Sequence, residues 1–166
     1  MPPQTILDIS RLDTSQVIVP RDEIYKVNPQ AFEFSMLDGI LLADREQGIM
    51  AAYRDVKDDE FWVRGHIPGR PVFPGVLMIE AAAQLLSYFV MSTVSDGRFL
   101  GFGGVDKVKF RGQVVPGDRL IIVGKLLEAR HGRRYVGLTQ GFVRGQMVYE
   151  GVITGMFLDK APSAGK

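Results

Sequence analysis

The 166-residue sequence contains no cysteine, so disulfide bonds and thiolate metal sites are excluded. It has only two histidines, which leaves few positions for histidine chemistry. Its 20 lysines and arginines nearly balance its 19 aspartates and glutamates, and the formal net charge is +1. Such a balance gives no general attraction to nucleic acid or to an anionic membrane. An acidic partner would have to meet a local basic patch.

The sequence also lacks a long uninterrupted hydrophobic run. Its most apolar segment, residues 76–91, is interrupted by Glu80, Gln84 and Ser87 and falls short of a membrane span. The first ten residues, MPPQTILDIS, lack the basic start and apolar run of a secretory signal. We therefore expect a cytoplasmic protein without a membrane span. The length and the apolar fraction of 46% suit one globular domain.

Strand-like runs fill most of the chain, and turn signals at residues 116–118, 131–133 and 144–146 separate the later ones. Regular spacing of this kind favours antiparallel hairpins in the second half. The expected strands span residues 35–44, 48–56, 99–110, 120–129, 134–144 and 147–158.

One helix stands out among these strands. Residues 76–92, VLMIEAAAQLLSYFVMS, are rich in Ala, Leu and Met, which favour helix. Apolar residues occupy nearly the whole circumference, which predicts burial on most sides. The exceptions, Glu80, Gln84 and Ser87, form one narrow polar stripe. The sequence therefore predicts an α+β fold, in which an antiparallel sheet wraps around one long central helix.

Glu80 is the first candidate for chemistry, because a carboxylate inside an apolar helix is costly to leave ionised without a partner. It could face a water channel or pair with an arginine such as Arg64, Arg70 or Arg111. Alternatively, burial would favour the protonated form, which can act as a general acid near neutral pH. The stripe alone leaves both readings open.

His66 is the second candidate. It precedes IPGRPVFPGV, a segment stiffened by three prolines that leads into the helix. A lone histidine before a turn is usually structural, but a stiff connection to a helix with a buried glutamate favours an acid–base pair. The other histidine, His131, lies in an expected hairpin turn, where a solvated side chain needs no catalytic role.

Gly75 is a third candidate, at the start of the expected helix. The first N–H groups of a helix have no intrahelical partner, and one of them could stabilise a developing oxyanion. The simpler interpretation is that Pro74 and Gly75 merely end the loop.

Residues 65–84, GHIPGRPVFPGVLMIEAAAQ, resemble the signature of the FabZ-type 3-hydroxyacyl-[acyl-carrier-protein] dehydratases, GHFPGxPxxPGV followed by (I/L)EAxAQ. His66 matches the family's catalytic histidine, Glu80 its catalytic acid, and Gly75 the glycine whose N–H meets the thioester carbonyl. Residues 101–120 are similar to a second family segment, and residues 28–40 fit a third more loosely. The resemblance covers residues 28–158.

This resemblance implies a hot-dog fold and the removal of water from 3-hydroxyacyl thioesters to give trans-2-enoyl thioesters. It implies no metal or redox cofactor, and dimers or trimers of dimers whose sites are shared between two subunits. We expect an N-terminal extension over residues 1–27, the dehydratase domain over residues 28–160 and a disordered tail over residues 161–166.

The chain departs from the family pattern at two places within the motifs and in its N-terminal extension, which is longer than typical. Residues 30–33 read Gln-Ala-Phe-Glu where the family has His-Arg-Tyr-Pro, and Ile67 replaces a phenylalanine. Neither touches the catalytic pair, but both bear on acyl-chain preference. The related FabA type, which also isomerises the double bond, usually has aspartate at the position of Glu80. Glutamate therefore favours dehydration alone.

The resemblance makes an acidic acyl carrier protein the expected partner. Lys107, Lys109 and Arg111 alternate along one expected strand and would share a face, with Val108 and Phe110 pointing the other way. Such a face could dock the carrier, or it could simply be a solvated face of the sheet.

Three other functions remain open. A hot-dog thioesterase would share the fold, although that family generally lacks the His-x-Pro-Gly segment. A hydratase would run the same chemistry in reverse on coenzyme A thioesters. A non-catalytic acyl-carrier-binding module would not need the set of His66, Glu80 and Gly75.

Overall fold

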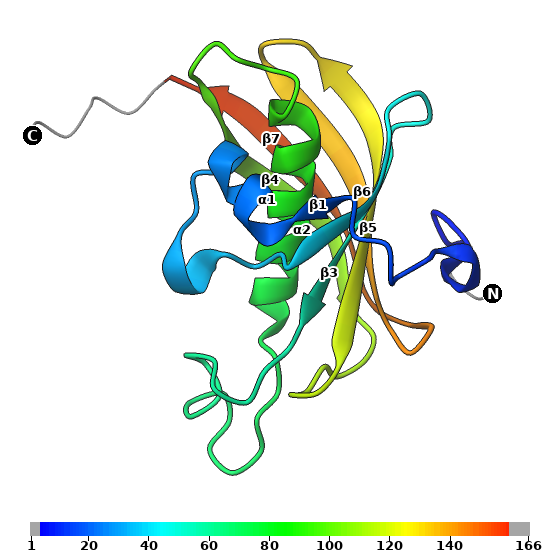
Figure 1. The fold of residues 1–166 in the computed structure, drawn as a ribbon, viewed down its shortest axis with the longest axis vertical. Helices are drawn as coiled ribbons and strands as arrows, with labels where there is room; N and C mark the ends of the chain where they lie inside the picture. Colours follow the sequence, from blue (N-terminus) through cyan, green and yellow to red (C-terminus); the bar gives the residue numbers. More distant parts are fainter. Residues whose placement is uncertain (1–3, 160–166) are drawn as a thin grey trace, which may run out of the picture.

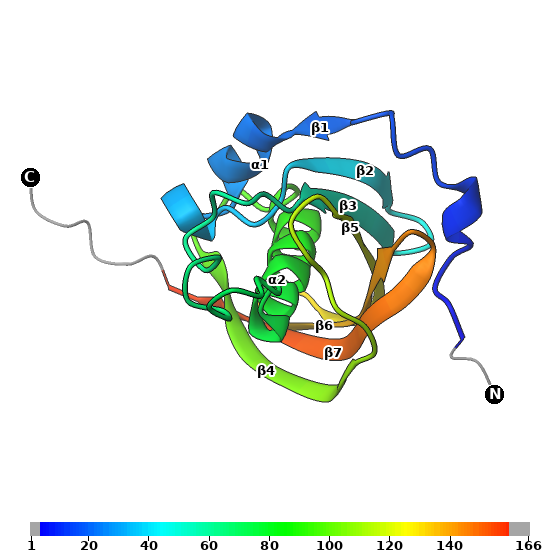
Figure 2. The same ribbon diagram turned by 90° about the horizontal axis from the view of Figure 1, so that it is seen from below.

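One antiparallel sheet of seven strands wraps around the long helix α2 (Gly75–Met91) in the computed structural model, which describes residues 4–159. Figure 1 shows the helix lying across the concave side of the sheet, and Figure 2 shows the sheet curving around it. The predicted α+β fold with a central helix is therefore confirmed. The tail expected over residues 161–166 lies outside the described residues.

Every pair of neighbouring strands is antiparallel, and the strand order is β1-β2-β3-β5-β6-β7-β4. A short helix, α1 (Arg21–Val27), precedes the second strand, and single 3-10 turns occur at Ile9–Arg11 and Phe32–Phe34. The strands are β1 (Val19–Pro20), β2 (Gly39–Asp44), β3 (Ile49–Asp55), β4 (Phe99–Phe110), β5 (Arg119–Arg130), β6 (Arg134–Val143) and β7 (Gln146–Leu158).

Five of the six expected strands begin and end within one residue of their predicted bounds. The first begins at Gly39 instead of residue 35. The reason is that the backbone just before it bonds to side chains: Met36 N–H donates to Gln84 and Leu37 N–H to Tyr25. No periodicity along the chain signals bonds of this kind.

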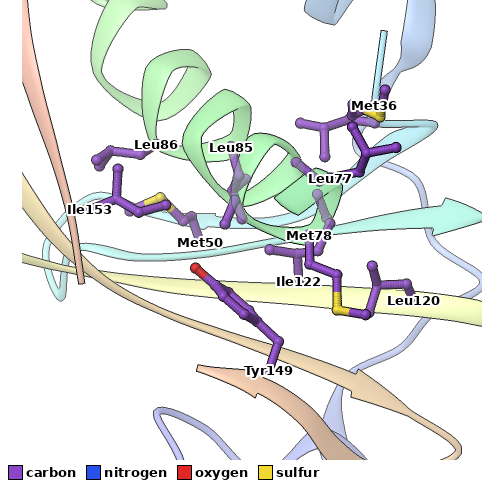
Figure 3. Close-up of a cluster of buried hydrophobic side chains, with 14 of the residues drawn as sticks. Met36, Met50, Leu77, Met78, Leu85, Leu86, Leu120, Ile122, Tyr149 and Ile153 are labelled. Carbon is purple, nitrogen blue, oxygen red and sulfur yellow. The ribbon is translucent and has the colours of Figure 1, made fainter. Parts of the chain in front are cut away.

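Helix α2 is buried because apolar side chains surround it. Leu85 and Leu86 are each 1% exposed. Figure 3 shows side chains of the helix, such as Leu85 and Met78, meeting Ile122 and Tyr149 of the sheet. Contact on several sides fixes the rotation of the helix, and with it the direction of the polar stripe.

The N-terminal residues cover the outer face of the sheet. A second apolar cluster there, centred on Ile121 and Phe142, packs under Ile6, Leu7, Ile9 and Leu12. The buried amide of Gln140 holds this segment, since it accepts from Ile6 N–H at 2.9 Å and donates to Gln4 O at 2.9 Å. Further along, Ile24 of α1 is fully buried in the main core. Residues 4–27 thus fold together with the sheet.

Within residues 4–159, no helix is both long enough and apolar enough to cross a membrane.

The contact between α2 and the sheet predicts a large stability cost for truncating Leu85. Leu85→Ala should lower the free energy of unfolding by about 2–5 kcal/mol, because it leaves a cavity in a packed core. Leu127→Ala is the matched control, since Leu127 is 56% exposed, and should cost less than about 0.5 kcal/mol. Urea unfolding at equal protein concentrations measures both. Similar losses in the two variants would contradict the packing described here.

Candidate active site

His66 lies in the loop between β3 and α2, which extends past the end of the sheet in Figure 1. Its side chain is exposed, and its Nδ1 lies 2.7 Å from Val72 O. A carbonyl oxygen can only accept, so Nδ1 carries the hydrogen of a neutral ring and Nε2 is left with a free lone pair. The ring is thus oriented to take up a proton at Nε2.

Backbone hydrogen bonds fold the loop tightly around this histidine. His66 N–H donates to Trp62 O at 2.8 Å, and Val72 N–H donates to His66 O at 2.9 Å. Val72 therefore fixes both the backbone of His66, through its N–H, and the ring, through its carbonyl oxygen.

A buried cluster anchors the loop to the sheet. Trp62 is 4% exposed, packs edge-on against Phe73 at 5.4 Å between ring centroids, and donates to Glu60 at 2.7 Å. Glu60 forms a buried ion pair with Arg54 of β3. Phe73 N–H donates to Val114 O at 2.7 Å. Because a buried charge must be paired, Arg54 and Glu60 hold each other and the loop in place.

Gly75 is the first residue of α2, after Pro74 with a φ of −59°. Its N–H has no acceptor within the helix and lies at the positive end of the helix dipole. A Cβ at this position would come within 2.8 Å of the Phe110 ring, so the close approach of β4 favours glycine. This N–H is suitable for polarising a carbonyl oxygen.

Glu80 is part of the predicted polar stripe. Its Oε1 accepts from Gln84 Nε2 at 2.7 Å. Glu80 and Ser87 line a crevice of about 50 Å³ between α2, β4 and β7. Gln30 also lines it, and its Oε1 and the Ser87 Oγ are buried without a hydrogen-bond partner in the described residues. Glu80 and Ser87 of the stripe therefore face a small polar crevice, whereas Gln84 is not among its lining residues.

The arginine partners considered for Glu80 are engaged elsewhere or exposed. Arg111 pairs with Glu150 at 2.5 Å, Arg70 donates to Gln113 at 3.3 Å, and Arg64 is exposed. Across residues 4–159, the hydrogen-bond partner of the Glu80 carboxyl is Gln84.

Within residues 4–159 of one subunit, the crevice that Glu80 lines does not include His66. The crevice beside Glu80 is lined by α2, β4, β7 and Gln30, and neither His66 nor Gly75 is among its lining residues. His66 instead lies exposed on its loop. A site that uses both residues needs either a movement of the loop or a second subunit.

The expected basic face on β4 is interrupted by a bulge. Asp106 pairs with Val152 and Lys109 with Glu150, so β4 has one extra residue between these pairs. Lys107 lies in this bulge with a φ of 53°, so the simple alternation predicted for the three cations does not hold across it. Lys109 and Arg111 do share a side, since both contact Glu150, at 3.6 and 2.5 Å. One carboxylate thus partly offsets their charge.

Sequence reasoning missed the residues that support the site. Arg54 interrupts an apolar strand, which could have marked a buried charge in need of a partner. Tyr25 gave no local signal, because its partner Gln84 lies 59 residues away. Such supports depend on tertiary contacts.

A sheet of this order around one buried helix defines a hot-dog-fold protein. A similar solved structure is the dehydratase heterocomplex ApeI:P from Xenorhabdus doucetiae, with a TM-score of 0.70, 17% identity, and coverage of 86% of this chain and 93% of that one. A thioesterase superfamily member from Thermus thermophilus has a TM-score of 0.56 and 16% identity, with 68% and 82% covered. At these identities the likeness concerns the fold alone.

Sequence comparison identifies the family. The FabA-like domain matches residues 28–152. The 3-hydroxyacyl-[acyl-carrier-protein] dehydratase FabZ of Escherichia coli O9:H4 (strain HS) is 35% identical over 134 residues, which cover 78% of this chain and 86% of that protein. The FabZ of Yersinia enterocolitica is 35% identical over 132 residues, 76% of each. The chain therefore belongs to the FabA-like family and is of the FabZ type, as its motifs predicted.

Proposed function

We propose that this protein removes water from 3-hydroxyacyl thioesters of an acyl carrier protein, giving trans-2-enoyl thioesters for fatty-acid or related acyl-chain synthesis. The observation that carries the proposal is the orientation of His66, whose Nδ1 faces Val72 O at 2.7 Å and leaves Nε2 free. The relatives named above, at 35% identity over most of the chain, support the same activity.

In the proposed mechanism, the Gly75 N–H donates a hydrogen bond to the thioester carbonyl oxygen, which acidifies the C2 proton. His66 Nε2 removes that proton, and the C2–H electron pair forms the C2–C3 double bond as the C3–O bond breaks. Glu80, in its protonated form, gives its proton to the departing hydroxyl, which leaves as water. Transfer of a proton from His66 back to Glu80 restores the enzyme. That the reaction needs no metal or redox cofactor remains a prediction, as does a cytoplasmic location.

We further propose that each site combines His66 of one subunit with Glu80 of another. The outer edge of β4 is unpaired within the described chain, because β4 is hydrogen-bonded only to β7. This edge carries three exposed apolar side chains, Phe102, Val105 and Phe110. An unpaired edge of this kind is a template for a second copy of the strand. The edge also borders the start of α2, where the Phe110 ring occupies the space that a Cβ at Gly75 would need, so pairing there would bring a second subunit close to the site.

The assigned roles predict that His66→Ala and Glu80→Gln each lower turnover by about 10²–10⁴-fold, because each removes a positioned acid or base. His131→Ala is the matched control, since His131 is exposed and should be dispensable. The assay follows the absorbance of the enoyl thioester from 3-hydroxyacyl substrates on both acyl carrier protein and coenzyme A. Near-normal turnover of a folded Glu80→Gln protein would reject Glu80 as the acid. A faster reaction on the coenzyme A substrate would favour the hydratase. No reaction on either substrate would favour the non-catalytic module.

A shared site predicts that two inactive variants rescue each other. When His66→Ala and Glu80→Gln proteins are unfolded together and refolded, about half of the dimers should be mixed. In a mixed dimer, one site carries both changes and the other neither, so about a quarter of wild-type activity should return. If each subunit holds a complete site, nothing returns. Mass spectrometry of the intact dimers confirms the mixing.

Carrier docking on β4 predicts a substrate-specific effect of charge reversal. Changing Lys107, Lys109 and Arg111 to Glu should raise KM for the carrier-bound substrate several-fold and leave a small thioester substrate little affected, because only the carrier is acidic and large. Arg11→Glu is the control, since Arg11 lies on the outer face of the sheet. Equal losses on both substrates would instead indicate a damaged site.

A further inference from the structure

The amide of Gln84 is the centre of a buried hydrogen-bond network. The residue is 0% exposed. Its Nε2 donates to Phe34 O and to Glu80 Oε1, each at 2.7 Å. Its Oε1 accepts from Tyr25 O–H at 2.7 Å and from Met36 N–H at 3.1 Å. Both donors and both acceptor positions of the amide are therefore used.

These partners fix which way the amide points. Turned over, Gln84 would set its NH₂ group against Met36 N–H and its oxygen against Phe34 O, and both buried contacts would be lost. The orientation shown leaves Gln84 as a donor to Glu80.

Tyr25 is the side chain that completes this arrangement. Its hydroxyl accepts from Leu37 N–H at 2.8 Å, so its single hydrogen is directed to Gln84. Burial raises the pKa of Tyr25 to about 12, so the hydroxyl remains a donor throughout the neutral range. Asn28 Nδ2 also donates to Gln84 O at 2.9 Å, which ties the end of α1 to the same turn of α2.

The orientation has a consequence for Glu80. Because a Gln84 N–H occupies Oε1, that oxygen is an acceptor, and the proton of the acid form belongs on Oε2. A general acid with its proton on a defined oxygen presents it in one direction. A turned amide would instead attract the proton to Oε1 and away from the reacting group.

We propose that Tyr25 is a positioning residue of the dehydratase site: through Gln84 it holds the Glu80 proton on Oε2. The inference rests on the proposed role of Glu80 as the acid. Tyr25 lies before the matched FabA-like domain of residues 28–152. Tyr25 is thus part of the segment predicted as an N-terminal extension, and it supports Glu80 through Gln84.

The first test is Tyr25→Phe, which removes one oxygen and keeps the packed ring. We expect kcat to fall about two- to tenfold, the usual net effect of one hydrogen bond, while KM stays within about twofold. Tyr88→Phe is the matched control. Tyr88 also packs against the core from α2, and its hydroxyl makes no hydrogen bond with residues 4–159, so its loss should leave kcat unchanged. Circular dichroism and thermal unfolding establish that both variants are folded.

The second test combines Tyr25→Phe with Glu80→Gln, in single turnovers followed by mass spectrometry. If Tyr25 acts through the Glu80 proton, it should have no further effect on the residual rate once that proton is absent. A further two- to tenfold loss in the double variant would overturn the inference, as would an unchanged kcat or a pure KM effect in Tyr25→Phe alone. Near-normal turnover of Glu80→Gln is a different result. It would reject Glu80 as the acid, and Tyr25 would then have no proton to position.

Discussion

The fully buried amide of Gln84 on helix α2 must find partners inside the protein, and the arrangement around Glu80 depends on how this demand is met. Leaving this amide without hydrogen bonds would cost much of the stability of a small domain. The bond between Gln84 and Glu80 meets part of the demand along the helix itself. The remainder is met from α1 and from residues 34–36, so the helix and the N-terminal third of the chain fix each other.

His66, the proposed base, is held by a separate set of contacts. The loop with His66 has few apolar contacts at its tip, but the ion pair between Arg54 and Glu60 and the packing of Trp62 on Phe73 fix its base. The prolines at positions 68, 71 and 74 reduce the freedom of the segment between. The proposed base and the proposed acid are therefore supported by different parts of the fold. If the two act together, their alignment depends on how these parts meet.

Members of the hot-dog fold with different chemistry share the sheet and the helix, so the fold itself says little about the reaction. The space beside the helix of this chain is polar. Glu80, Ser87 and Gln30 face a crevice of about 50 Å³ that contains buried polar atoms without partners in the described residues. A space of this size and polarity suits a small polar leaving group, such as water, and is too small for a long alkyl chain.

The sequence by itself determined the central helix and the six longer strands, and it singled out three candidate site residues. A helical run with one polar stripe has a single consistent rotation in a core, and a segment as specific as GHIPGRPVFPGV identifies its family. Tertiary structure decided the rest. The partner of Glu80 is Gln84 rather than an arginine, a bulge at Lys107 breaks the expected basic face, and Tyr25 reaches across 59 residues to the helix. Periodicity reports only neighbours along the chain, whereas these contacts join segments that come together only when the sheet closes around the helix.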